Sequence, residues 1–269
     1  MSKDFTIVSH EETVQDKKEF NRRHPESMHQ VYFHDKAELN SVIRSLHFLV
    51  NTQNGMDVDD YVVGADAPVY KYLKNDLQDK TVLIVGTGTG REMKTARELG
   101  ASRVEGTTLG SRNAAFAKEM VGESPTLCDN HAMPWERETF DVIAGFQIME
   151  HSFMPVVFLL ECNRLLKTGG SICMETPPAK TISLDSWLHH VICPTGRQLC
   201  YLFQKTGFKP VEFNGTDISN ISIDEEDVPG LDDPEVMVYV KAIKQDPLTY
   251  ERRDMLRFYH ILNGNEFVY

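Results

Sequence analysis

The sequence is poor in cysteine and in positive charge, and it has no long hydrophobic run. Its five cysteines form no Cys-x-x-Cys pair, which argues against a zinc site or a disulfide framework. No apolar run reaches the roughly 18 residues that a membrane-spanning helix needs, and the first residues lack the apolar core of a signal peptide. We therefore expect a soluble, cytoplasmic protein whose cysteines are buried packing residues.

The charge balance also restricts the partners that the chain can bind. There are 40 acidic residues against 28 lysines and arginines, which gives a formal net charge of −12. This charge repels phosphates, so a nucleic acid is not an expected partner. With 269 residues of which 41% are hydrophobic, the chain can bury a sizeable core and fits one domain with additions. The oligomeric state cannot be read from these features.

A short apolar run that ends in three alternating glycines is the most informative segment. Val82 to Val85 fit a strand buried on both faces, and a helix is predicted from Arg91 to Leu99. Glycine permits a positive φ and lets a ligand approach the main chain, while the N–H groups of a helix start favour a negative charge. The turn from Gly86 to Gly90 is therefore predicted to hold a small ligand. The alternative is a structural turn that binds nothing.

The spacing of these glycines distinguishes between ligand classes. A dinucleotide fingerprint requires its third glycine at the position of Arg91, and a phosphate-binding P-loop requires glycine in place of Met93. A nicotinamide-dependent oxidoreductase or epimerase is thus disfavoured. The pattern Gly-x-Gly-x-Gly instead resembles the first motif of class I methyltransferases that use S-adenosylmethionine.

Motifs further along the chain follow in the order seen in the same family. A second strand at 103–109 ends about 20 residues past the glycines, where nucleotide-binding units place a ribose-binding side chain. After it come a helix at 114–120, a strand at 126–128, Phe-Asp opening a strand at 140–144, a Glu-His turn, a Glu-x-x-Arg-x-Leu-Lys helix and Gly-Gly before a strand at 171–175. From about residue 80 to 213 the series resembles the type 11 class I methyltransferases.

The resemblance implies an α/β, Rossmann-like class I methyltransferase fold. Its sheet would have seven mostly parallel strands with an antiparallel last strand, which we expect at 236–243, before a C-terminal helix at 247–262. Residues 79–269 would form the S-adenosylmethionine-binding domain. Residues 1–78 are expected to form an N-terminal helical cap, because apolar residues from Leu39 to Val50 recur at helical spacing. This stripe fits either closure over the cofactor or plain core packing.

The cofactor implied by the resemblance is S-adenosylmethionine, and its contacts can be assigned position by position. The glycine turn would hold the methionine part, Thr108 and Leu109 the ribose and adenine, and Asp129 the exocyclic amine of adenine. Residues at the end of the fourth strand would line the cofactor and acceptor pocket. The complete set is Gly86, Thr87, Gly88, Thr89, Gly90, Thr108, Leu109, Asp129, Asn130, His131, Gly145, Phe146 and Gln147.

Two positions depart from the family pattern. The family usually has acidic residues where this chain has Ile84 and Thr108. Ile84 cannot hold the amino group of the methionine part, and Thr108 offers one hydroxyl where a carboxylate accepts two hydrogen bonds. Cyclopropane fatty acid synthases and some relatives resemble this chain in having Thr-Leu at the second position. A non-catalytic subunit or a binding module that keeps only the fold is therefore the main alternative to an enzyme.

The Glu-His turn after the fourth strand supplies the candidate catalytic residues. Ligands of open α/β sheets bind at the edge where His151 and Glu150 are expected, and imidazole can take a proton near neutral pH. The alternative is that the pair only fixes a turn. Some ubiquinone-pathway methyltransferases suggest a divalent metal at such a pair, but only two ligands are visible, so no metal is predicted. Fold analogy suggests a small molecule, lipid or sugar as the acceptor.

Overall fold

A computed structural model describes residues 67–88, 90–181, 190–224 and 227–245. Most of the expected N-terminal cap therefore lies outside the described residues. So do Thr89 of the glycine turn and the helix expected at 247–262. The described residues comprise most of the predicted cofactor-binding domain and the short helix that precedes it.

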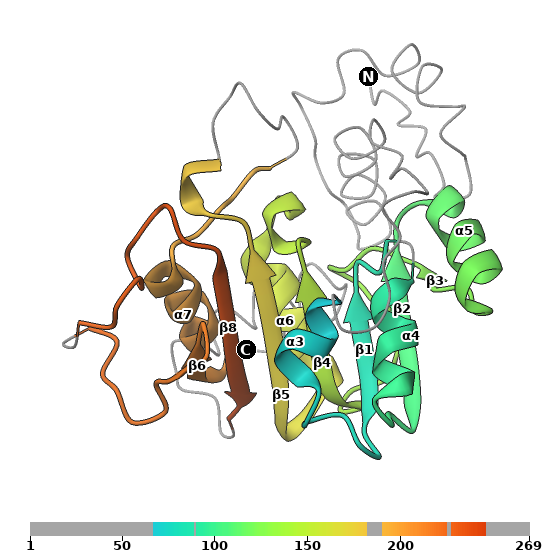
Figure 1. Cartoon of the computed structure of the whole chain (residues 1–269), viewed down its shortest axis with the longest axis horizontal. Coiled ribbons are helices and arrows are strands. Elements are labelled where there is room, and N and C mark those ends of the chain that lie inside the picture. Colours follow the sequence, from blue (N-terminus) through green and yellow to red (C-terminus); the bar gives the residue numbers. More distant parts are fainter. Residues whose placement is uncertain (1–66, 89, 182–189, 225–226, 246–269) are drawn as a thin grey trace, which may run out of the picture.

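An eight-stranded sheet forms the centre of the fold, in the order β3-β2-β1-β4-β5-β8-β6-β7. Its strands are β1 (Thr81–Val85), β2 (Arg103–Thr108), β3 (Thr126–Leu127), β4 (Phe140–Phe146), β5 (Leu166–Thr176), β6 (Phe208–Phe213), β7 (Thr216–Asp217) and β8 (Val238–Lys244). Strands β1 to β5 pair in parallel, whereas β8 is antiparallel to both β5 and β6. In Figure 1 the arrows of β5 and β8 accordingly point in opposite directions. The predicted fold class is confirmed, and the two-residue β7 adds an eighth strand to the seven expected.

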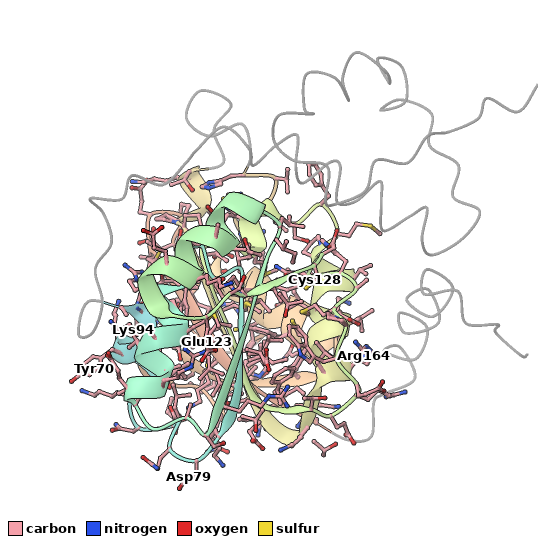
Figure 2. The ribbon with its side chains drawn as sticks, turned by 90° about the vertical axis from the view of Figure 1, so that its right-hand side faces the viewer. Tyr70, Asp79, Lys94, Glu123, Cys128 and Arg164 are labelled. Atoms are coloured by element: carbon pink, nitrogen blue, oxygen red, sulfur yellow. The ribbon has the colours of Figure 1, made fainter. Side chains whose placement is uncertain are left out.

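Helices cover both faces of the sheet. They are α3 (Pro68–Leu73), α4 (Arg91–Glu98), α5 (Ser111–Val121), α6 (Pro155–Leu165) and α7 (Gly196–Lys205), with 3-10 turns η4 (Met149–His151) and η5 (Ala179–Thr181). Figure 2 shows Tyr70 of α3 and Lys94 of α4 on one side of the sheet and Arg164 of α6 on the other. None of these helices is both long and apolar enough to cross a membrane.

Alternation along the strands produces one hydrophobic core on each face. On β1, Ile84 packs in the core under α3 and α4, while Leu83 packs in the core shared with α6 and α7. Continuous apolar strands of this kind are typical of parallel sheets, because both faces are covered. All five cysteines are buried, as predicted.

Local sequence signals set the ends of the helices. Thr195 and Gln198 form a reciprocal capping box at the start of α7. Pro155 occupies the first turn of α6, where its missing N–H has no cost. The acidic segment between β7 and β8 contains no helix or strand among its described residues, in agreement with its turn-forming composition.

The parallel strands all end at one edge of the sheet, and this arrangement brings the candidate residues together. The glycine turn follows β1, Thr108 ends β2, Asp129 follows β3 and η4 follows β4. Ligands of open α/β sheets bind at this edge. Figure 2 shows Cys128, just after β3, and Asp79, just before β1, toward opposite ends of the sheet.

Candidate functional site

The glycine turn after β1 has a main chain that other residues could not adopt without strain. Gly86, Gly88 and Gly90 have φ angles of +70°, +51° and +84°. A Cβ on Gly86 would lie only 2.4 Å from Cγ1 of Ile148, so there is no room for a side chain. Gly90 is the N-cap of α4, whose first N–H groups begin here. The predicted glycine turn at a helix N-terminus is thus present, and ligand binding there stays a prediction.

Thr107 fastens this turn to the end of β2, and sequence reasoning missed it. Its hydroxyl accepts a hydrogen bond from the N–H of Gly86 at 2.9 Å and donates to Oδ1 of Asn130 at 2.6 Å. Its carbonyl accepts from the N–H of Thr87 at 2.8 Å. Thr107 is fully buried. One side chain therefore links the segments that follow β1 and β3.

The two positions that depart from the family pattern are Ile84, in β1, and Thr108, at the end of β2. Ile84 is 1% exposed in the core under α3 and α4, so it offers no polar contact to a ligand. Thr108 is 6% exposed, and its hydroxyl accepts a hydrogen bond from the N–H of Gly110 at 3.3 Å. Its second lone pair and its proton remain available to a ribose hydroxyl.

Asp129, His131 and Ser152 form a buried hydrogen-bonded chain. Oδ1 of Asp129 lies 2.6 Å from Nδ1 of His131, and Nε2 of His131 lies 2.8 Å from Oγ of Ser152. Each of the three residues is 3% exposed. The order is that of a hydrolytic triad, but a nucleophile must be reachable by substrate and Ser152 is enclosed. Both ring nitrogens of His131 are engaged within the protein, so only its main chain could meet adenine.

A second network holds the segment that follows Asp129. Glu161, which is 1% exposed on the side chain, accepts the N–H of Met133 at 2.7 Å and pairs with Arg164 at 2.7 Å. Arg164 also donates to the carbonyls of Trp135 and Met133. The Glu-x-x-Arg motif therefore has a structural role here, because it anchors the loop between β3 and β4 to α6.

The end of β4 presents three predicted pocket residues with different environments. A Cβ on Gly145 would lie 2.7 Å from Sδ of Met174, so this position faces packed core. Phe146 is 9% exposed and stacks on Tyr72 with ring centroids 6.3 Å apart. Gln147 is exposed, adopts a φ of +54° and donates from Nε2 to Glu175 at 3.2 Å.

Glu150 is the most unusual carboxyl group of the described residues. It is fully buried, and neither of its carboxyl oxygens has a hydrogen-bond partner in the described part of the chain. Burial raises its pKa to about 8, and the nearby charge of Glu175 adds to the shift. Its main-chain carbonyl accepts from the N–H of Val191 at 2.7 Å, which brings the segment after the undescribed residues 182–189 against η4.

Two histidines lie beside this carboxyl group. Nε2 of His151 is 3.9 Å from Oε1 of Glu150, and the rings of His151 and His190 meet edge to face with centroids 5.0 Å apart. The donor atoms of Glu150, His151 and His190 all lie within 4.8 Å of one another, a spacing at which a cation could be held. The sequence suggests that His189 and His190 face the acceptor or form an exposed structural pair, but it cannot place His190 beside His151, because 38 residues lie between them and turn chemistry cannot fix so long a connection.

Glu175, at the end of β5, is a further residue that the sequence analysis did not single out. It is 8% exposed, accepts from Gln147 and hydrogen-bonds to Tyr72. Burial, followed by the hydrogen bond and charge of Glu175, raises the pKa of Tyr72. The edge of the sheet at β4 and β5 is therefore rich in acidic groups.

Comparison with known proteins agrees with this geometry. Residues 83–174 match the family model described as a methyltransferase domain. The ubiquinone biosynthesis O-methyltransferase of Roseobacter denitrificans is 27% identical over 161 residues, which cover 52% of this chain and 64% of that protein. The protein of the same name from Pseudomonas paraeruginosa is 32% identical over 106 residues, or 37% of this chain and 45% of that one. The matched part of the chain thus spans less than two thirds of the length of either relative.

Solved structures share the fold at low sequence identity. A methyltransferase from Haloferax volcanii, solved with an activator protein, has a TM-score of 0.51 and 17% identity over 65% of this chain and 86% of its own. An S-adenosylmethionine-dependent methyltransferase from Mesorhizobium loti has a TM-score of 0.50 and 18% identity over 66% of this chain and 99% of its own. These similarities establish the architecture of the sheet and its helices.

Proposed function

We propose, since the chain belongs to the class I S-adenosylmethionine-dependent methyltransferases, that it transfers a methyl group from S-adenosylmethionine to a small-molecule acceptor. One observation carries the proposal. The glycine turn and the segment that leads into Glu150 and His151 are in contact, since Ile148 fills the space beside Gly86. A methyl donor on the turn would therefore lie next to a group able to accept a proton.

The residues present fit this cofactor. Bare backbone at the glycine turn would take the methionine part, with Thr87 and Thr89 on either side of Gly88. Thr108 and Leu109 would contact the ribose and adenine, and the buried Asp129 with Asn130 the adenine edge. Of the three residues at the end of β4, the exposed Gln147 would border the acceptor side, whereas Gly145 faces packed core. Ile84 has no polar side-chain atom that could bind the amino group of the methionine part. Backbone carbonyls would accept its hydrogen bonds instead.

The chain itself has little chemistry to perform. S-adenosylmethionine supplies a methyl group that is already activated, so positioning in a dry pocket provides most of the acceleration. His151 would accept the proton of an acceptor hydroxyl or amine. A positive charge formed on His151 lies 3.9 Å from Glu150, whose ionised form would stabilise it. No metal is needed for this role.

The finer identity of the acceptor belongs to the same proposal. Relatives named as O-methyltransferases of ubiquinone biosynthesis make a small molecule with a hydroxyl group the first class to assay. A lipid or sugar hydroxyl fits the same chemistry. A nucleic acid is not proposed, because the net charge of −12 opposes it.

A non-catalytic protein that keeps the fold is the second candidate, and the buried Ile84 favours it. Calorimetric titration with S-adenosylmethionine, S-adenosylhomocysteine and NAD, each with and without EDTA, separates the candidates. We expect binding of the first two ligands alone, unaffected by EDTA. Binding of none would support the non-catalytic alternative, and binding of NAD would point to an oxidoreductase.

Replacement of Gly88 by valine locates the site. A Cβ at a φ of +51° is strained and occupies ligand space, so affinity for S-adenosylmethionine should fall at least about tenfold, or about 1.4 kcal/mol. Gly215→Val is the matched control, because Gly215 also has a positive φ of +86° but lies in the β6–β7 turn with open space around it. Unchanged affinity in a folded Gly88→Val protein would remove the cofactor from this turn.

A further inference from the structure

We propose that the buried chain Asp129–His131–Ser152 couples the adenine end of the cofactor site to the acceptor turn, with His131 as a positioning residue. The inference rests on the proposed function, because it takes the glycine turn and the residues that follow β3 as the cofactor side and η4 as the acceptor side. It goes beyond that function by giving His131 a role other than contact with adenine. It also includes Ser152, which no sequence motif marks.

The hydrogen bonds of this chain have a defined direction. A carboxylate only accepts, so the proton between Asp129 and His131 belongs to Nδ1 of the ring, and a ring with one proton then accepts at Nε2. With the ring assigned one proton, the hydroxyl of Ser152 donates to His131 across 2.8 Å. The oxygen of Ser152 in turn accepts from the N–H of Met154 at 3.3 Å. Every donor points toward Asp129.

The Asp129 end of the chain is tied to the glycine turn. Asn130 accepts from Thr107 at 2.6 Å, and Thr107 accepts from the N–H of Gly86 at 2.9 Å. Cys128 also donates its N–H to the carbonyl of Thr108 at 3.2 Å. A ligand that bridges the turn and the adenine edge would therefore act directly on the position of Asp129.

The Ser152 end of the chain closes the acceptor turn. The N–H of Ser152 donates to the carbonyl of Met149 at 3.0 Å, which completes η4. Glu150 and His151 are the two residues between these bonded ends. A shift of Ser152 that carries its main chain toward or away from His131 would therefore move the turn that carries both groups.

Burial makes such coupling effective. All three residues are 3% exposed, so water cannot replace a weakened bond and the partners polarise one another. A ligand on the glycine turn would act on Asp129 through the bonds from Gly86 to Thr107 and from Thr107 to the neighbouring Asn130, and so alter the bond between Asp129 and His131. We infer that this displacement passes to the His131 ring and from the ring to Ser152 through their two hydrogen bonds.

Histidine NMR with Ser152 variants tests this coupling. Protein carrying ¹⁵N-labelled histidine is titrated with S-adenosylmethionine or S-adenosylhomocysteine while the ring signals of His131 and His151 are followed. Ser152→Ala removes the donor to His131, and Ser152→Thr retains it. Thr206→Ala is the matched control, because it removes another buried hydroxyl, which donates to Leu202 in α7.

In the wild-type protein and in Thr206→Ala we expect both rings to respond to the ligand. In Ser152→Ala the His131 response should persist, the His151 response should fall at least about threefold, and affinity should stay within about threefold. Ser152→Thr should restore the His151 response. An undiminished His151 response in Ser152→Ala would overturn the coupling while leaving the proposed function intact.

Two further outcomes are also decisive. If Ser152→Ala does not fold, Ser152→Cys replaces it, since a thiol of similar size is a weak donor and the same reduced His151 response is expected. If the wild-type protein binds neither ligand, the proposed function fails, and the coupling fails with it. A ligand that binds without moving the His131 signals would overturn the role of Asp129 at the start of the chain.

Discussion

His151 is the residue on which acceptor chemistry depends at this site. It lies at the end of η4, half-buried, between Glu150 and His190. We expect His151→Ala to lower methyl transfer by roughly a hundredfold, a typical contribution of a general base, and to leave S-adenosylmethionine affinity within about threefold. Phe153→Ala, two residues away at an exposed position, controls for disturbance of the turn.

Binding can be measured on His151→Ala before an acceptor is known. A large loss of cofactor affinity in a well-folded variant would show that the imidazole supports the cofactor pocket. The role as a base would then have to be abandoned. Turnover follows with hydroxyl-bearing small molecules as acceptors.

Thr108 tests how this chain compensates for a missing carboxylate. If its hydroxyl faces the ribose, Thr108→Asp should keep or tighten S-adenosylmethionine binding, because a charged acceptor makes stronger hydrogen bonds to the ribose hydroxyls. Calorimetry measures the change, and Thr126→Asp in the neighbouring β3 controls for the added charge. A cofactor-bound structure with residue 108 far from the ribose would refute the assignment whatever the affinity.

Among the elements, α6 does more than cover the sheet. Its Glu161 accepts the N–H of Met133 and pairs with Arg164, so loss of the carboxylate leaves buried donors unsatisfied. We expect Glu161→Ala to lower the free energy of unfolding by about 1–3 kcal/mol in urea titrations. Affinity for S-adenosylmethionine should fall as well, because the loop after Asp129 loses its anchor.

Glu138→Ala is the control for Glu161→Ala. Glu138 is exposed, and its hydrogen bonds with Thr168 and Lys244 lie at the surface. The control variant should leave affinity unchanged. Equal losses of affinity in the two variants would mean that α6 does not hold the cofactor loop.

The elements themselves were largely predictable, because their signals are local. Apolar runs bounded by glycine or polar residues predicted β1, β2 and β4 to within about two residues at each end. The boundary of β5 was placed too late: the strand begins at Leu166, and its pairing with β4 shifts register between Leu166 and Ser171, where Gly169 and Gly170 lie. Glycine spacing alone could not reveal that outcome.

The contacts of the site were predictable only in part, since they join residues far apart in the chain. Spacing identified the glycine turn, Asp129 and the Glu-His pair. It could not reveal that Thr107 joins Gly86 to Asn130, or that Ser152 meets His131, because those bonds depend on how β2, β3 and η4 meet at the sheet edge. Side-chain identity gives no such signal without the fold.

At the scale of the whole molecule, the buried Glu150 should make stability depend on pH. In the folded protein its pKa is raised to about 8, mainly by burial, while in the unfolded chain it returns to its ordinary value of 4.5. Between these values the folded state holds a proton that the unfolded state releases. The free energy of unfolding therefore falls as pH rises through this range, by at most about 1.4 kcal/mol per pH unit from this group.

Glu150→Gln cannot release that proton, so its stability advantage over the wild type should grow from about pH 5 to pH 8 and level off above. Urea titrations at several pH values measure the difference. Glu138→Gln should show no such rise, because the pKa of Glu138 is lowered, chiefly by its hydrogen bond with Thr168, and the group is ionised in both states across this range. A constant difference between Glu150→Gln and the wild type would mean that Glu150 is ionised in the folded protein, and that a positive charge near η4 compensates it even before any ligand binds.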